Sequence, residues 1–310
     1  MQKTAAPISN KAVSGRYSGW RGNLRLIQVT QVIVSLGLYI YLDQYDLHRA
    51  QHLKRVNAKL DTARRLGFLA ILGQHIHRLK ILTILFLLKL LRLFVVGREG
   101  NREKVQESRA EWLKSSLIRL GPTFIKLGQA MGTRADLLPL PFVKALGDLQ
   151  DNVPPFSNAL AVERIETDLA RSLEEVFSEF NPTPIAAASL GQVYRARLWS
   201  GEEVAVKVQR PNLQQTIRGD LEILRKITRL SEWFPSLGKN ADWAGMLVEF
   251  DETIHEEMDY VAEGRNAESF RENFRGWKNI HVPKIFWGAT TSKVLTMEFI
   301  DGIKVTDLEG

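Results

Sequence analysis

The chain has 310 residues, of which 45% are hydrophobic, so it is long enough to bury a core in one large domain or two smaller ones. It contains no cysteine, which excludes disulfide bonds and thiolate metal ligands. Its six histidines lack the spacing of known metal motifs, and we predict no metal-ligating residues in the chain itself.

The net charge of +7 comes from one end of the chain. Residues 1–80 contain 13 Lys and Arg against three Asp, a balance of +10, which leaves −3 for the remainder. This charge flanks apolar segments rather than covering a folded binding domain, so it favours an anionic membrane surface over nucleic acid. We therefore expect anionic membrane lipids as partners and no nucleic acid.

Two apolar stretches lie in this N-terminal arm. The first, 26–42, is uncharged and slightly shorter than the ~20 residues that span a bilayer, so it could cross a membrane if it is tilted or the bilayer is thinned. The second, 81–96, carries Lys89 and Arg92 on one helical face, which favours a helix lying in the membrane interface. Helices buried against the protein remain an alternative for both stretches, and an acid-free N-terminus also suits an organelle transit peptide.

The next segments have helical character. Residues 111–142 predict a helix pair broken at Gly121 and Pro122, and 151–157 have the composition of a linker. Amphipathic spacing predicts a helix over 158–180. Further along the chain we predict two long helices over 213–233 and 242–274, and strands over 281–286 and 292–300.

Residues 184–211 carry the most informative pattern. The runs 193–198 and 204–208 alternate like strands, and the short loop 199–202 predicts a β-hairpin. Its second strand, V-A-V-K, matches the V-A-I-K strand of protein kinases, whose lysine pairs with nucleotide phosphates and with a glutamate of a following helix. We therefore predict that Lys207 is functional.

A loop of alanines precedes this hairpin, where ordinary kinases have G-x-G-x-x-G. Only Gly191 remains as a glycine. A Cβ on each alanine restricts φ and narrows the space beside the backbone, so the fit to a phosphate must differ from that of a glycine-rich loop.

Two further motifs carry charged and amide groups. Lys126 and Gln129 are three residues apart in K-L-G-Q, so both can reach into one site. Asp259, Glu263 and Asn266 recur at i, i+4 and i+7, which predicts one helical face directed at Lys207. Taken alone, each motif also fits a solvated polar helix edge.

Together, these patterns resemble the KxGQ, ExD and alanine-loop hallmarks of the UbiB/AarF family of atypical kinase-like proteins, over roughly residues 111–310. The resemblance implies an α+β fold: a protein-kinase-like small lobe, with an antiparallel sheet and helices, after a helical KxGQ extension. We divide the chain into a basic, apolar, membrane-associating helical arm (1–100), the extension (101–157) and the small lobe up to the hinge (158–310).

The resemblance also implies a site. Lys207 and Glu263 form the catalytic pair. The KxGQ extension acts as a regulatory lid over the nucleotide, and in the family the ExD pair contacts the KxGQ segment. The lid residues are Lys126, Gln129, Glu257 and Asp259. The residues expected to bind ATP or ADP are Ala186, Ala187, Ala188, Ser189, Gly191, Val193, Lys207, Met297, Glu298 and Ile300.

A kinase also needs a carboxylate at the nucleophile and groups that hold Mg²⁺. No H-x-D-x-x-x-x-N loop and no D-F-G follows Gly302. We therefore expect an N-terminal part of a longer protein, without the large lobe and inactive alone, with Mg²⁺ bound by residues of a C-terminal lobe.

Three functions remain open. The resemblance implies a membrane-associated atypical kinase or ATPase that supports isoprenoid-quinone biosynthesis, of the ubiquinone or plastoquinone type, with prenyl-lipid or quinone-biosynthesis proteins as partners. A nucleotide-gated lipid-binding scaffold without phosphoryl transfer is the alternative, and a membrane-anchored helical protein without nucleotide chemistry is a third. We expect a soluble kinase-like domain at a bacterial cytoplasmic, thylakoid-type or organelle membrane.

Overall fold

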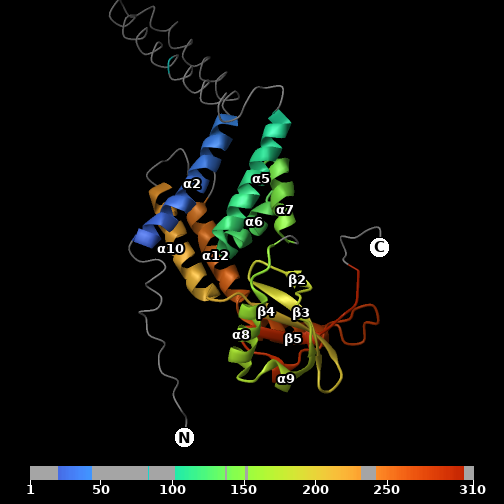
Figure 1. Cartoon of the computed structure of the whole chain (residues 1–310). Coiled ribbons are helices and arrows are strands. Elements are labelled where there is room, and N and C mark those ends of the chain that lie inside the picture. The colour runs from blue at the N-terminus through green and yellow to red at the C-terminus, as the bar shows by residue number, and fades with distance from the viewer. Residues whose placement is uncertain are drawn as a thin grey trace, which may run out of the picture.

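The structure is a computed structural model, and it describes residues 20–43, 83, 102–136, 138–150, 153–231 and 242–303. In this part of the chain a layer of helices lies beside a small antiparallel sheet, so the fold is α+β as predicted (Figure 1). Two short helices on the other side of the sheet, α8 (Asn158–Leu169) and α9 (Leu173–Val176), complete the small lobe.

Among the residues that the structure describes, four helices and a short 3₁₀ turn begin the helical layer. The predicted break between two helices is present at Gly121, whose φ of +95° suits glycine, and Pro122 starts the next helix. The first helix of this pair begins at Arg102 rather than at 111. The elements are α2 (Trp20–Asp43), α5 (Arg102–Leu120), α6 (Pro122–Gly132), α7 (Leu140–Gly147) and η2 (Asp148–Gln150).

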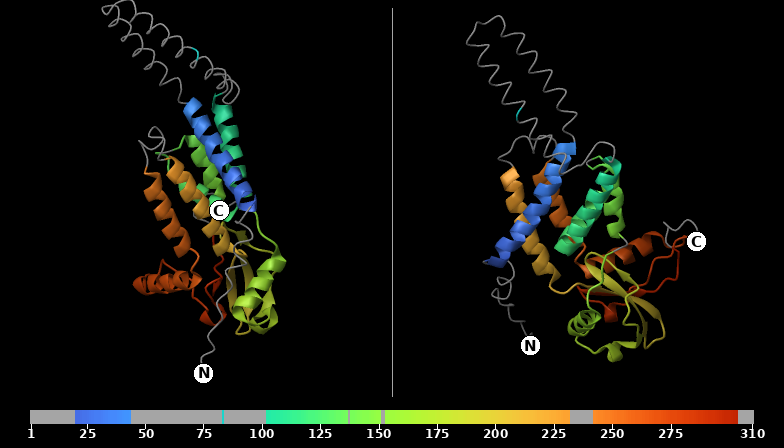
Figure 2. Two further views of the ribbon diagram at one scale, coloured as in Figure 1. Left: turned by 90° about the vertical axis from the view of Figure 1, so that its left-hand side faces the viewer. Right: turned by 45° about the horizontal axis from the view of Figure 1, so that its top comes forward.

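Arg25 of helix α2 makes polar contacts with two other helices of the layer. Arg25 donates to both carboxylate oxygens of the buried Asp220 on α10 (Leu213–Ser231), at 3.0 and 3.1 Å. The same guanidinium donates to the Leu120 carbonyl at the end of α5. The two views of Figure 2 show α2 running beside α5 and α10.

Among the helices that the structure describes, none combines the length and the apolar character that a membrane crossing requires. Val29 and Tyr39 on the inner face of α2 are buried in the helical core, which corresponds to the packed-helix alternative for 26–42. The second apolar stretch, 81–96 with Lys89 and Arg92, lies outside the described residues except for Thr83.

The sheet has the order β1-β3-β4-β5, with β2 paired to β3, and all of its pairings are antiparallel. The predicted hairpin is confirmed as β3 and β4. Val204, Val206 and Val208 of β4 are fully buried on the face covered by α8. The strands are β1 (Phe177–Phe180), β2 (Ala186–Ala187), β3 (Gly191–Leu198), β4 (Glu203–Gln209) and β5 (Val294–Glu298).

The single helix predicted over 158–180 is wrong. Helix α8 (Asn158–Leu169) ends at Ala170, which has a left-handed φ of +52°. Ser172 and Glu175 then form a capping box that starts the one-turn helix α9 (Leu173–Val176), and β1 follows. The S-x-x-E pattern marks a new helix start, and it outweighs the continuous amphipathic spacing.

The strand predicted over 281–286 is also wrong. Only Ile285 pairs, in an isolated bridge with Met297. Pro283 cannot donate a ladder hydrogen bond, and this explains why the segment does not extend the sheet. The last predicted strand, 292–300, is present in a shorter form as β5.

The helix predicted over 242–274 is broken in two. Helix α12 (Trp243–Glu256) ends before Glu257, and α13 (Tyr260–Asn273) begins after Asp259. The Asp259 carboxylate accepts from the amides of Val261 and Ala262, so this residue caps α13 and does not share a helical face with Glu263 and Asn266. An N-cap aspartate ends one helix and starts another.

Candidate functional site

The centre of the predicted site is an ion pair between β4 and α13. The Lys207 Nζ donates to both carboxylate oxygens of Glu263, at 2.7 and 2.8 Å. It also lies 4.7 Å from the ring centre of Tyr260. Both charged side chains are partly exposed, at 25% and 39%, so the pair is open to a ligand.

The strand register places further predicted residues on the same face. Val193 of β3 is the cross-strand partner of Lys207, and Met297 of β5 is the partner of Ala205 on β4. Cross-strand partners and residues two apart on one strand share a face of the sheet. Val193, Lys207 and Met297 therefore lie together, on the face opposite the buried valines of β4.

The alanine loop lies at the start of this hairpin. Ala186 and Ala187 form β2 and pair with Val193 and Gln192 of β3. The Ala188 amide then donates to the Gly191 carbonyl at 2.8 Å, which closes a tight turn. The loop is thus held as a continuation of the sheet.

Gly191 is explained by packing. A Cβ at this position would lie 2.5 Å from the Val208 carbonyl oxygen and 2.6 Å from the Tyr260 hydroxyl. Real Cβ atoms do not approach backbone oxygen so closely, so any side chain would displace β4 or Tyr260. Only glycine fits between these two groups.

The predicted lid residues contact two parts of the site. The Lys126 Nζ lies 2.5 Å from a carboxylate oxygen of Glu257, in the turn between α12 and α13. The Gln129 Oε1 accepts from the hydroxyl of the buried Ser189 at 3.2 Å, and its Nε2 donates to the Leu149 carbonyl at 2.7 Å. The predicted contact between the KxGQ and ExD segments is therefore present, through Glu257 and not through Asp259.

The predicted hinge, residues 298–300, uses part of its backbone in hydrogen bonds within the protein. The Glu298 amide donates to the Lys284 carbonyl, and the Phe299 amide donates to the Glu203 carbonyl. Ile300 lies beyond the end of β5 and is 45% exposed. Two of the three amides of the predicted hinge are therefore used in contacts within the protein.

Sequence reasoning missed two residues, a buried tyrosine beside the pair and a half-buried arginine under the alanine loop. Tyr260 is fully buried, and its hydroxyl has no hydrogen-bond partner among the described residues. Burial, followed by the nearby Glu263 and Glu257 carboxylates, raises the pKa of Tyr260 well above its usual value, so it stays neutral. Arg210 lies three residues after Lys207 under the alanine loop, and burial lowers its pKa. The sequence offered one signal for each: Tyr260 directly follows Asp259, and Arg210 comes three residues after Lys207.

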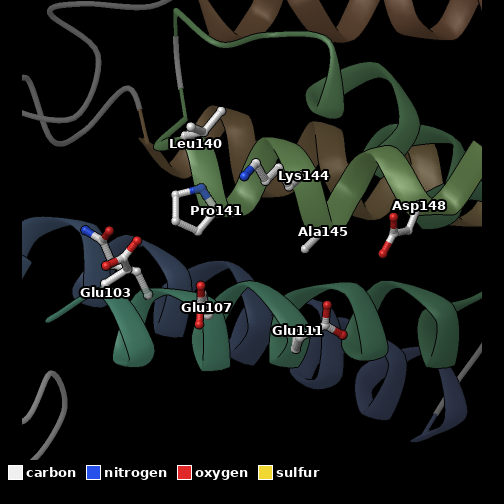
Figure 3. A pocket seen from close by; sticks show the side chains of 9 residues that line it. Glu103, Glu107, Glu111, Leu140, Pro141, Lys144, Ala145 and Asp148 are labelled. Carbon is white, nitrogen blue, oxygen red and sulfur yellow. The ribbon is translucent and has the colours of Figure 1, made fainter. Parts of the chain in front are cut away.

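The pocket drawn in Figure 3 lies elsewhere. It has a volume of about 670 Å³ between α5 and α7, and its residues include none of the predicted nucleotide ligands. Glu103, Glu107 and Glu111 of α5 face Leu140 and Lys144 across it. In the described part of the chain, no group of three or more acids and histidines is placed to hold a metal ion.

An antiparallel sheet whose strand lysine is ion-paired to a glutamate of a helix packed beside it defines the small lobe of a kinase-like protein. Residues 148–310 match the family described as the ABC1 atypical kinase-like domain. This match covers more than half of the sequence, and the chain belongs to this family, as the motifs predicted.

Relatives with kinase names cover part of the chain. Protein ACTIVITY OF BC1 COMPLEX KINASE 8, chloroplastic, of Arabidopsis thaliana is 46% identical over 202 residues, which are 64% of this chain and 26% of that protein. Probable protein kinase UbiB of Pseudomonas aeruginosa is 44% identical over 222 residues, 72% of this chain and 42% of that protein. The chain therefore spans less than half the length of these relatives.

A solved structure from Mycobacterium tuberculosis, a protein in complex with erythromycin, is 29% identical to the chain. Its TM-score is 0.45, and the alignment covers 67% of this chain and 52% of that one.

Proposed function

We propose that this chain carries the ATP-binding half of a membrane-associated atypical kinase or ATPase. The observation that carries the proposal is the bidentate contact of Lys207 with Glu263. The two oxygens of this one carboxylate hold the ammonium in one place, and this is the arrangement that directs a kinase lysine at nucleotide phosphates.

The surrounding residues suit the same ligand. The alanine loop would cover the phosphates, and Val193 and Met297 supply apolar surface for the base on the face that carries Lys207. Because the lysine and glutamate are both partly exposed, a phosphate can approach the ammonium without rearrangement of the core. ADP fits these contacts as well as ATP does.

Mg²⁺ would neutralise charge on the phosphates, and in kinases its ligands belong to the large lobe. The described residues offer no competing cluster of acids and histidines for it. The proposed contribution of this chain is binding and orientation of the nucleotide.

The KxGQ extension would act as a lid. Its contacts with the ExD turn and with the alanine loop come from one face of α6, through Lys126 and Gln129. Gly128 of the same motif packs closely against Leu117 and Leu149, because a Cβ at this position would lie 2.8 and 2.6 Å from their side chains. Such a lid would bar a protein substrate and favour a small one.

The outer face of α2 supports membrane association. Large apolar side chains recur along it at helical spacing, and they are 37 to 71% exposed. The exposed positions described between 23 and 38 carry no charge. An apolar face on a basic arm suits a helix lying at an anionic bilayer. The exposed side chains are Trp20, Leu24, Ile27, Val34 and Leu38.

The proposed physiological role, support of isoprenoid-quinone biosynthesis through prenyl-lipid or quinone-biosynthesis proteins, rests on the family resemblance alone. Its test is the ubiquinone or plastoquinone content of host cells that lack the gene, complemented by the wild type or by Lys207→Met. Equal quinone content with both would contradict a role that needs the nucleotide site.

The test of the nucleotide proposal compares Lys207→Met with Lys293→Met in the full-length protein. Lys293 lies just before β5 and pairs with Asp168 on α8 at 3.6 Å, away from Glu263, so it controls for loss of one lysine. ATP binding, followed with a fluorescent analogue, and ATP hydrolysis should both fall only in Lys207→Met. Undiminished hydrolysis in that variant would refute the enzyme proposal, and binding without hydrolysis in the wild type would establish the scaffold.

A further inference from the structure

Arg210 makes an unusual set of contacts directly after β4. Its guanidinium donates to three backbone carbonyls: that of Ala188 at 3.0 Å, that of Ser189 at 2.9 Å and that of Pro154 at 2.8 Å. Its own amide donates to the Leu190 carbonyl at 2.9 Å. One residue therefore holds three consecutive carbonyls of the alanine loop.

No carboxylate neutralises this arginine among the described residues. Its other neighbours include the Phe156 ring, whose centre lies 5.3 Å from the guanidinium carbon, and Tyr260, with which it interacts electrostatically. Arginine stays protonated in proteins, so a half-buried positive charge lies against the loop. Arginines usually pair with acids or face water, and this one does neither fully.

The same contacts fasten the predicted linker 151–157. Pro154 and Phe156 both touch Arg210, and the Phe156 amide donates to the buried Gln192 side chain at 3.1 Å. Gln192 lies in β3, one residue after Gly191. The end of the KxGQ extension is thus attached to the alanine loop from a second side, in addition to the contact between Gln129 and Ser189.

The direction of the loop carbonyls matters for a phosphate. In a trans peptide the C=O and the following N–H point in opposite directions. Because Arg210 binds the carbonyls of Ala188 and Ser189, the amides of Ser189 and Leu190 point away from it. Carbonyl oxygens repel phosphates and amides bind them, and a loop with few glycines has little freedom to turn its peptides over.

We propose that Arg210 is a positioning residue that holds the alanine loop and the linker in one arrangement, with the loop amides turned away from the guanidinium and so oriented for the phosphates of a nucleotide. Its charge adds a positive field at the same place. The nucleotide part of this inference rests on the proposed function, whereas the positioning of the loop does not.

The experiment uses the full-length protein with three variants. Arg210→Met removes the donors and the charge, and Arg210→Lys keeps the charge but cannot bind three carbonyls at once. Arg218→Met is the control, because Arg218 is 73% exposed on α10 and its ion pair with Glu222 is long at 3.9 Å. Hydrogen exchange of the Ala188 and Phe156 amides reports on the loop and the linker. Affinities for ATP and adenosine report on the phosphates and the base.

In both Arg210 variants the Ala188 and Phe156 amides should exchange about tenfold faster, while the Val206 amide in the sheet is unchanged. ATP affinity should fall about tenfold in Arg210→Met and less in Arg210→Lys, with adenosine affinity kept within about twofold. Arg218→Met should match the wild type throughout.

Unchanged exchange at Ala188 and Phe156 in Arg210→Met would overturn the inference, whatever the nucleotide does. An equal loss of ATP and adenosine affinity would also overturn it, because it would reveal a general loss of structure. If the wild type binds no nucleotide, the proposed function fails, and the exchange measurement still decides whether Arg210 positions the loop.

Discussion

The ammonium of Lys207 lies 2.7 and 2.8 Å from the two carboxylate oxygens of Glu263, although 56 positions separate the residues in the sequence. Strand β4 and helix α13 supply one partner each, and Leu295 of β5, the cross-strand neighbour of Lys207, is buried with Tyr260 of α13. The pair depends on this packing.

Replacing Glu263 by Gln should therefore weaken nucleotide binding more than it weakens the fold. The amide keeps the shape but loses the charge that holds the ammonium, and we expect about tenfold lower ATP affinity. Because the pair is partly exposed, the free energy of unfolding should change by less than about 1 kcal/mol. Titration with a fluorescent ATP analogue and urea unfolding measure the two quantities, and the exposed Glu272→Gln on the same helix is the control. An equal affinity in both variants would contradict this role of Glu263.

Two buried tyrosines should respond oppositely to loss of their hydroxyl groups. The Tyr260 hydroxyl has no hydrogen-bond partner among the described residues, so Tyr260→Phe should be neutral or stabilising. The Tyr194 hydroxyl accepts from Gln192 and donates to Asn158, so Tyr194→Phe should cost about 1 to 2 kcal/mol. Urea unfolding of both variants measures the difference. A clear loss of stability in Tyr260→Phe would mean that this hydroxyl has a partner.

Glycines at two positions should differ in their tolerance of a methyl group. Gly191→Ala would force a Cβ against the Val208 carbonyl and the Tyr260 hydroxyl, and it should cost about 1 to 3 kcal/mol. Gly147→Ala, at the end of α7, meets no atom within 4 Å and should be neutral or gain up to about 1 kcal/mol. Thermal unfolding compares them. Equal melting temperatures would show that β4 yields easily at Gly191.

The two lid contacts should contribute unequally to stability. Gln129→Leu leaves the Leu149 carbonyl and the buried Ser189 hydroxyl without this partner, and it should cost about 1 to 3 kcal/mol. Lys126→Met breaks a partly exposed ion pair with Glu257 and should cost about 0 to 1 kcal/mol. Urea unfolding measures both. If Lys126→Met is the more damaging change, the ion pair and not the amide holds the extension to the site.

The N-terminal arm should carry the protein to anionic vesicles. Residues 1–100 are expected to drive sedimentation with liposomes that contain phosphatidylserine. Ile27→Ser with Val34→Ser on the exposed face of α2 should reduce it, because each change removes apolar area from the bilayer contact. Val248→Ser, an equally exposed position on α12, is the control. Equal sedimentation of a chain that starts at Asn101 would remove this assignment.

Local patterns predicted the elements whose partners are close in the sequence. The hairpin of β3 and β4 needs only a short turn between two alternating runs, and the break at Gly121 needs only the backbone freedom of glycine followed by proline. The turn at Glu257 to Asp259 was missed, because an N-cap aspartate four residues before a glutamate has the same spacing as one face of a continuous helix.

The composition and the order of motifs in the sequence were enough to predict an α+β kinase-like protein of this family, with Lys207 and Glu263 as partners. They could not show that Gly191 is enclosed by the Val208 carbonyl and Tyr260, or that Arg210 binds the loop carbonyls. These contacts join segments tens of residues apart. They depend on how close the backbones come when the sheet and helices pack, and spacing along the chain carries no such information.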